Sequence, residues 1–422
     1  MLEKKKNAIV IGGGPAGMMA AYMIAKNGVP VVLMEKNAKL GKKMLIAGKG
    51  RCNVTNDSDM AAFLANMPGN GKFLYSAYRN FPASAVIRWF NDCGVPLKTE
   101  RGDRVFPVSD CSADIVSCLE RQLRKAGAKV DFLSEVEEIV MGESSVKGVK
   151  VKGVLRPAAA VLVATGGCSY PLTGSTGDGY RFAAAAGHSV TPLFPSLVPL
   201  TVAEADVKQL EGLSLRNVAV TLKDGGGVLD HRFGELVFTA DGLSGPVILS
   251  ASRAASLHFT KNPETPLTLL LDLKPALDEK QLNDRLLRDF ESFSKRSYIH
   301  ILEELLPRKI IPVFAQRSGI EPIKAGHQLT KEDRKTILRL LKAFPFTVTR
   351  CHRLAEAIVT GGGVSVKEID PKTMMSKKKE GLFFAGEVLD IDGYTGGFHI
   401  QAALSCGYQA GMAMSSYCLK GN

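Results

Sequence analysis

The chain has 422 residues, of which 45% are hydrophobic and 23% are charged. These values are ordinary for a folded globular protein, so they exclude extensive disorder, and the length predicts two or three domains. Its 54 Lys and Arg against 42 Asp and Glu give a net charge of +12, which favours anionic partners such as phosphate-bearing cofactors. Basic residues are scattered apart from Lys4–Lys6 and Lys377–Lys379, so we expect a basic surface and no dedicated nucleic-acid site.

The N-terminal segment predicts a strand–helix–strand unit. An apolar strand over Ala8–Ile11 runs into glycines, a helix follows over Ala16–Lys26, and a second strand covers Val31–Met34. This order is typical of a parallel sheet with a crossover helix. Further short strands are predicted, in chain order, over Val130–Phe132, Val136–Val140, Val146–Val151 and Val161–Ala164.

The pattern changes after Thr191. From Leu277 to Lys342 apolar residues recur at helical spacing, whereas the tail contains only a strand over Gly381–Ala385 and a helix over Gln401–Met414. Because that tail is too short to fold alone, we predict that the middle of the chain is inserted into one nucleotide-binding domain. Before the helical part, short strands between Gly-rich or charged turns predict an all-β unit, with strands over Leu197–Val202, Val218–Leu222, Val228–His231, Glu235–Thr239 and Leu267–Leu273.

A G-x-G-x-x-G fingerprint lies between the first strand and the first helix, at Gly12, Gly14 and Gly17. In a dinucleotide-binding fold the first glycine makes the turn, the second lets a pyrophosphate approach the backbone, and the third lets the helix pack on the strand. Glu35 ends the second strand, where a carboxylate can accept hydrogen bonds from both ribose hydroxyls of an adenosine. A glycine turn followed by an exposed glutamate is the purely structural alternative.

The next segment, Leu40–Asn56, is rich in glycine and basic residues. We expect a flexible loop whose cations, Lys42, Lys49 and Arg51, lie near the pyrophosphate. A nicotinamide-binding Rossmann domain normally uses these positions for a helix, so the loop favours a larger cofactor that is wrapped by the chain, namely FAD. A solvated basic loop is the alternative interpretation.

Two later strands also end in small residues, as expected where the backbone must meet a ligand. One of these strands lies within Val161–Gly167. The other is followed by Gly386 and Glu387, and the Glu387 carboxylate could bind the ribityl hydroxyls of FAD. Gly396 and Gly397 then open a helix, and the positive end of such a helix would stabilise negative charge on a reduced flavin.

Together these motifs resemble a flavoprotein family that includes 3-dehydro bile acid reductases and aminoacetone oxidases. The resemblance extends over essentially the whole chain. Its most specific elements are the GRCN-x-TN and GE-x-LD-x-DG-x-TGG sequences, and the matching segments are Gly12–Gly17, Gly48–Asn56, Arg104–Pro107, Gly234–Leu236, Gly242–Pro246, Thr360–Val364, Thr373–Lys377 and Gly386–Gly397.

The resemblance implies an α/β fold of the two-dinucleotide-binding type, in which a Rossmann-like FAD domain carries a β-barrel-like subdomain and a helical subdomain. The expected boundaries are 1–190 and 357–422 for the FAD domain, 191–275 and 343–356 for the barrel, and 276–342 for the helices. The residues expected to bind the cofactor are Gly12, Gly14, Pro15, Ala16, Gly17, Glu35, Lys36, Lys42, Gly50, Arg51, Cys52, Asn53, Val136, Ala164, Thr165, Gly166, Gly386, Glu387, Gly396, Gly397, Phe398, His399 and Ile400.

Three positions depart from the family pattern. Ala47 stands where Ser is frequent, Ala240 where His is frequent, and His399 where Asn is usual. Since His399 is expected beside the flavin, substrate preference is expected to differ. His399 and Tyr394 are the candidates for catalytic proton transfer, and for each a cofactor-packing role is the alternative.

The resemblance and the motifs together predict an FAD-dependent oxidoreductase. The favoured version reduces a conjugated C=C bond in a small organic substrate, with NAD(P)H as a transient donor. The first alternative is an oxidase that uses O2 on a small amine-type substrate. The alternative from another class is a flavin-bearing RNA-binding or regulatory protein, which only the charge of +12 supports.

Several classes of protein are excluded by missing patterns. The sequence has no H-E-x-x-H, no Walker A and no second G-x-G-x-x-G, which argues against a zinc protease, an NTPase and a separate nicotinamide domain. The eight cysteines show no metal-ligand spacing, so reduced thiols and no metal are expected. Glycines interrupt the N-terminal apolar run, and no apolar stretch of about 20 residues follows, so we expect a cytoplasmic protein without a membrane span; the oligomeric state stays open.

Overall fold

The computed structural model describes residues 7–420, so the basic run Lys4–Lys6 lies outside the described part. Contacts within the chain divide it into two compact units. The first comprises the residues up to Phe194 together with those from Leu354 onward, and the second runs from Pro195 to Arg353. The three-part division expected above stays a prediction.

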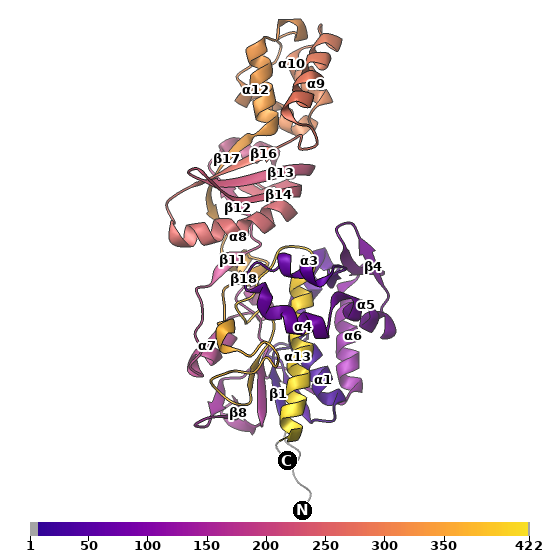
Figure 1. Cartoon of the computed structure of the whole chain (residues 1–422), viewed down its shortest axis with the longest axis vertical. Coiled ribbons are helices and arrows are strands. Elements are labelled where there is room, and N and C mark those ends of the chain that lie inside the picture. The colour runs from indigo at the N-terminus through magenta and orange to yellow at the C-terminus, as the bar shows by residue number, and fades with distance from the viewer. Residues whose placement is uncertain (1–6, 421–422) are drawn as a thin grey trace, which may run out of the picture. The chain divides into compact units, whose positions relative to one another are not determined.

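A five-stranded parallel sheet forms the centre of the first unit (Figure 1). Its order is β19-β10-β1-β2-β6, and every neighbouring pair is parallel. Both β1 and β10 are apolar and buried along their whole length, as expected for a sheet that helices cover on both faces. This confirms the Rossmann-like α/β fold; the strands are β1 (Ala8–Ile11), β2 (Val31–Met34), β6 (Lys129–Asp131), β10 (Ala160–Val163) and β19 (Leu382–Phe384).

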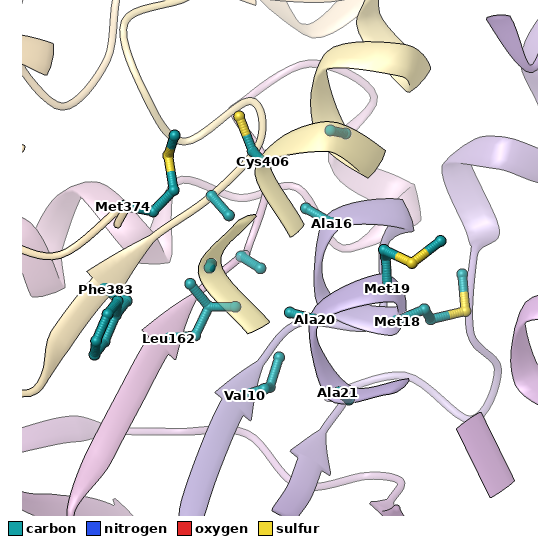
Figure 2. Packing of buried hydrophobic residues seen from close by; sticks show 14 of the residues in the cluster. Val10, Ala16, Met18, Met19, Ala20, Ala21, Leu162, Met374, Phe383 and Cys406 are labelled. Atoms are coloured by element: carbon teal, nitrogen blue, oxygen red, sulfur yellow. The ribbon is translucent and has the colours of Figure 1, made fainter. Parts of the chain in front are cut away.

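Two helices, α1 (Pro15–Lys26) and α13 (Phe398–Lys420), pack closely against each other beside this sheet. Small residues make the close approach possible. A Cβ added at Gly407 would overlap the carbonyl oxygen of Ala16, and one added at Gly411 would lie 2.8 Å from the carbonyl oxygen of Ala20. Figure 2 shows the alanine face of α1 turned toward α13 and the apolar side chains of the neighbouring strands below it.

The rest of the first unit surrounds this core. Its antiparallel strands are β3 (Thr55–Asn56), β4 (Leu97–Glu100), β5 (Arg104–Pro107), β7 (Glu138–Met141), β8 (Val146–Val151) and β9 (Val154–Pro157). The remaining helices are α2 (Lys42–Ile46), α3 (Met60–Ala65), α4 (Tyr75–Asn80), α5 (Ala83–Asp92), α6 (Ser112–Lys125) and α7 (Asp178–Ala185). The expectation of a continuous loop over Leu40–Asn56 was therefore wrong at α2.

A closed six-stranded barrel forms one part of the second unit, in the order β12-β15-β14-β13-β16-β17. Its apolar interior continues into a set of short helices, so that barrel and helices share one core. The barrel strands are β12 (Leu200–Val202), β13 (Ser214–Asp224), β14 (Gly227–Phe238), β15 (Gly242–Ser244), β16 (Leu267–Asp272) and β17 (Phe344–Cys351), and the helices are α9 (Glu279–Ser292), α10 (Tyr298–Ile301), α11 (Ile311–Ser318) and α12 (Lys331–Lys342).

Two expectations for this unit were wrong in detail. The strands predicted over Val228–His231 and Glu235–Thr239 are one continuous strand, β14, because Gly234 lies within the strand and makes no turn. The stretch predicted as all-β also contains a helix, α8 (Pro246–Lys261). Proline is frequent in the first turn of a helix, and Pro246 occupies that turn in α8, directly after Gly245.

The contact between α1 and α13 gives the first prediction. Gly411→Val should lower the free energy of unfolding by about 1–3 kcal/mol, because the new side chain meets Ala20 and Met23 in a closely packed contact. Helix propensity alone would predict the opposite sign, since valine forms helix better than glycine. Urea unfolding measures the change, with the exposed Leu419→Val in the same helix as the control. Equal stability of the two variants would contradict the close packing.

Candidate functional site

The glycine turn after β1 has the geometry of a phosphate cradle. Gly12 has φ of 105°, and a Cβ added at Gly17 would overlap the Gly12 carbonyl oxygen. Gly14 caps α1, and a Cβ added there would meet no atom within 4 Å. The three glycines therefore make the turn, leave open space before the helix, and allow helix and strand to pack, which are the three roles that a bound pyrophosphate requires. Backbone amides at the start of α1 point into that open space.

Glu35 holds a fixed position beside this turn, directly after β2. One carboxylate oxygen, Oε2, accepts a hydrogen bond from the Gly13 amide at 2.7 Å. The other, Oε1, accepts bonds from the backbone amide of Asn37 at 2.8 Å and from its side chain at 2.7 Å. The side chain is buried and oriented by its neighbours, so its placement relative to the glycine turn is suited to the ribose of an adenosine.

Two buried polar atoms at the expected cofactor site have no protein partner. They are Oδ1 of Asn53, in the basic loop, and Oγ1 of Thr165, just beyond the end of β10. A Cβ added at Gly397 would lie 2.8 Å from that Asn53 oxygen, so the start of α13 approaches the same loop. Buried polar atoms without partners are rare, and a bound molecule commonly satisfies them. The residues present thus fit a dinucleotide that reaches from α1 to α13.

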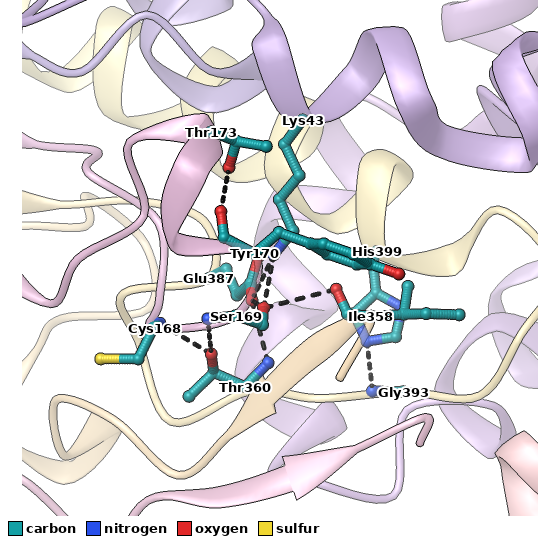
Figure 3. Close-up of polar contacts among 10 residues, drawn as sticks. All are labelled: Lys43, Cys168, Ser169, Tyr170, Thr173, Ile358, Thr360, Glu387, Gly393 and His399. Atoms are coloured by element: carbon teal, nitrogen blue, oxygen red, sulfur yellow. Dashed lines mark hydrogen bonds and ion pairs between the residues drawn. The ribbon is translucent and has the colours of Figure 1, made fainter. Parts of the chain in front are cut away.

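A partly buried ionic cluster follows β19 (Figure 3). Both carboxylate oxygens of Glu387 lie 2.9 Å from Nζ of Lys43, which belongs to α2. The carboxylate also accepts bonds from the Thr360 amide at 2.9 Å and from the Ser169 hydroxyl at 3.1 Å. Burial alone would raise the pKa of Glu387, but Lys43 and the Thr360 amide lower it below the ordinary value. Glu387 is therefore a carboxylate held by the protein.

Lys43 was missed by the sequence reasoning, which selected its neighbour Lys42. The two lysines differ in their partners. Lys43 turns to Glu387 and Ser169, whereas Nζ of Lys42 donates to Oδ1 of Asn37 at 3.0 Å and to the carbonyl oxygen of Leu172 at 2.8 Å. The sequence shows two adjacent cations in this loop. Which of them faces Glu387 depends on how the side chains are arranged around α2. The expected bond from Glu387 to ribityl hydroxyls stays a prediction.

His399 is the second residue of α13 and is half-buried. Its Nε2 accepts a hydrogen bond from the backbone amide of Gly393 at 2.9 Å (Figure 3). Burial lowers its pKa, partly offset by the negative charges of Glu387 and Asp392. By contrast, burial raises the pKa of the Cys52 thiol to about 12, so that thiol stays protonated and packs as an apolar group.

Arg51 has partners other than the expected pyrophosphate. Its Nη2 pairs with Glu100 and lies 2.6 Å from Oδ1 of Asp110, and its guanidinium stacks 4.1 Å from the centre of the Phe106 ring. The two carboxylates raise the pKa of Arg51. Because this charge is committed to the protein, the role of Arg51 in cofactor binding stays a prediction. Lys36 is similarly paired, with Asp178 at 2.6 Å.

The other expected cofactor residues lie on the same elements. Val136 and Phe398 are buried in the core of the first unit. Tyr394 donates its backbone amide to the carbonyl oxygen of Asn66 at 2.9 Å. Positive φ angles occur at Gly50, Gly166, Gly386, Gly396 and Gly397. Pro15 and Ala16 begin α1, Ala164 follows β10, and Ile400 lies in the first turn of α13.

Within residues 7–420, no group of three or more His, Cys, Asp or Glu side chains is arranged to hold a metal ion. Across the same residues, no helix combines the length and apolarity needed to cross a bilayer.

Comparison with known proteins gives full-length matches. A family model described as the HI0933-like protein Rossmann domain matches residues 6–413. A 3-dehydro-bile acid delta(4,6)-reductase from Clostridium scindens is 30% identical over 96% of this chain and 98% of its own. A ribosomal RNA dihydrouridine synthase from Haemophilus influenzae is 31% identical over 96% of this chain and 98% of its own.

Solved structures support the same fold. A flavocytochrome c3 fumarate reductase in an open conformation superimposes with a TM-score of 0.53 at 17% identity, covering 99% of this chain and 79% of that protein. Such a likeness bears on the fold alone, and it agrees with the Rossmann-like fold described above.

The position of Glu35 gives the second prediction. Glu35→Gln should weaken FAD binding about tenfold or more, because a charge-assisted hydrogen bond is worth roughly 1.5–3 kcal/mol. FAD released from each purified protein on denaturation, measured per mole of protein, reports the loss. The exposed Glu138→Gln is the matched control. Equal FAD content in the two variants, or release of FMN in place of FAD, would refute the role of Glu35.

Proposed function

The chain belongs to the HI0933-like Rossmann-domain family of FAD-dependent oxidoreductases, and from this we propose that it reduces a carbon–carbon double bond conjugated to a carbonyl group. The proposal rests on the type of bond that the names of two relatives have in common. The bile acid enzyme acts, by its name, on double bonds that adjoin a 3-keto group. Dihydrouridine is uridine whose ring double bond beside a carbonyl has been reduced. Steroid and pyrimidine differ greatly, but the reacting group is the same.

This chemistry divides between cofactor and protein. Bound FAD, once reduced, supplies a hydride for the carbon β to the carbonyl. The protein has to stabilise the negative charge that then develops on the carbonyl oxygen. Positive groups of the chain that are suited to this task are the N-terminal amides of α13 and the ammonium group of Lys43. Glu387 holds the ammonium group of Lys43 in place, with both carboxylate oxygens 2.9 Å from Nζ.

The electron donor is proposed to be NAD(P)H. The sequence contains a single G-x-G-x-x-G, which this proposal assigns to FAD. A nicotinamide would therefore reach the flavin through the space that the substrate uses, and the two ligands would exclude each other.

A shared pocket predicts ping-pong kinetics. Double-reciprocal plots of rate against acceptor concentration, measured at several NAD(P)H concentrations, should be parallel, and high acceptor should inhibit competitively against NAD(P)H. Steady-state assays under nitrogen, with a cyclic enone as acceptor, give these plots. Intersecting lines would mean that a ternary complex forms, and hence that a separate nicotinamide site exists.

An oxidase that uses O2 on a small amine is the first rival. The two functions differ in the fate of electrons in air. The reductase should consume NAD(P)H in proportion to enone saturated, with hydrogen peroxide formed only as a minor fraction. An oxidase should release one peroxide per amine oxidised and should leave the enone intact. Peroxide and product, both quantified in the same aerobic reaction, distinguish these outcomes.

RNA is a second candidate substrate, favoured by the full-length match to a ribosomal RNA dihydrouridine synthase and by the net charge of +12. Incubating the reduced protein with unmodified ribosomal RNA tests it. Dihydrouridine formed in RNA but not from free uridine would assign an RNA substrate. Saturation of small cyclic enones with no change in RNA would assign a small-molecule substrate, as the sequence favoured.

A further inference from the structure

The hydrogen bond from Gly393 to His399 determines where the imidazole carries its proton. A backbone amide can only donate, so Nε2 of His399 must present its lone pair at 2.9 Å. In a neutral imidazole one nitrogen accepts and the other bears hydrogen. The ring proton of His399 therefore lies on Nδ1.

Nδ1 is left available to a ligand. Within residues 7–420 the structure gives it no hydrogen-bond partner, although the ring as a whole is half-buried. The residue lies in the first turn of α13, two positions after Gly397, which approaches the unpartnered Asn53 oxygen. An N–H donor is thus present where the chain already offers free polar atoms to a bound molecule.

Charges around His399 act in both directions. Glu387 and Asp392 favour the imidazolium ion, whereas burial and the ammonium group of Lys43 disfavour it. Most of the Glu387 charge is offset locally, because both its oxygens lie 2.9 Å from Lys43. The start of α13 adds partial positive charge. The net effect lowers the pKa of His399, and protonating Nε2 would also break its bond to Gly393.

We propose that His399 acts as a neutral hydrogen-bond donor, through Nδ1–H, to the carbonyl oxygen of the substrate. This role rests on the proposed function. As hydride adds to the β carbon, the electrons of the C=C bond shift toward the carbonyl carbon, and the carbonyl oxygen becomes an enolate that accepts the Nδ1–H bond. A proton from water then adds to the α carbon and restores the carbonyl. His399 stabilises the oxygen and keeps its own proton throughout.

Nitrogen NMR of protein labelled with ¹⁵N-histidine tests the tautomer without any turnover. One set of ring signals should disappear in His399→Asn, which assigns it, and in the FAD-loaded wild type that set should report hydrogen on Nδ1. Any titration of this ring should lie below the ordinary imidazole pKa of about 6.5. Hydrogen on Nε2, or titration of this ring near its ordinary pKa of about 6.5, would overturn the proposal.

Three variants test the role in turnover. The side-chain amide of Asn can donate from the position of Nδ1, whereas Gln reaches the position of Nε2, and Phe offers no donor. His399→Asn should therefore keep kcat for enone reduction within about tenfold, while His399→Phe and His399→Gln should lose about 10²–10³-fold, the usual cost of one lost oxyanion donor. FAD content, measured in each variant, shows that the site is still assembled.

The outcomes separate the role of His399 from the proposed function. Equal loss in the Asn and Phe variants, or a wild-type rate that falls above pH 6.5 and loses that dependence in both variants, would mean that His399 is a proton donor or only a packing residue. If the His399→Phe variant reduces the enone as fast as the wild type, the proposal is likewise wrong. Absence of enone reduction in the wild type would overturn the proposed function, and the NMR result would then still report the tautomer.

Discussion

The site depends on one constraint. At the carboxyl ends of three parallel strands, the backbone must come close both to neighbouring backbone and to the bound ligand. Strands β1, β10 and β19 are neighbours in the sheet, and each is followed within three residues by a glycine with positive φ, at Gly12, Gly166 and Gly386. Side chains at these turns would fill the space that a dinucleotide needs. The same requirement for small residues extends to the contact between α1 and α13, so both helices can begin at this edge of the sheet.

Charge in the site is held by the protein in pairs. Glu387 with Lys43, Arg51 with Asp110, and Lys36 with Asp178 each combine a cation and a carboxylate at short distance. Pairing fixes the direction of these long side chains. Because each charge already has a partner, a ligand meets hydrogen-bond donors more than net charge. Neutral His399 fits this arrangement, because it offers a donor without adding a cation beside Lys43.

The fold was readable from the sequence because its strongest signals are local. The strand over Ala8–Ile11 and the glycines after it depend on neighbours within a few residues, and these elements were predicted almost to the residue. Partners distant in sequence were not readable. Glu387 and Lys43 are 344 positions apart, and Arg51 meets carboxylates from the β4–β5 region, so their pairing depends on tertiary packing. Helix α8 was not predicted, although Pro246 directly after Gly245 is a helix-start signal.

A single-turnover measurement tests the central claim most directly. The protein is reduced photochemically under nitrogen, freed of any nicotinamide, and mixed with a cyclic enone while flavin absorbance is followed. The account predicts that the absorbance of oxidised flavin returns at a rate that depends on the enone, and that the product has gained two hydrogens across its C=C bond. A flavin that stays reduced with the enone and is reoxidised only when O2 is admitted would contradict it.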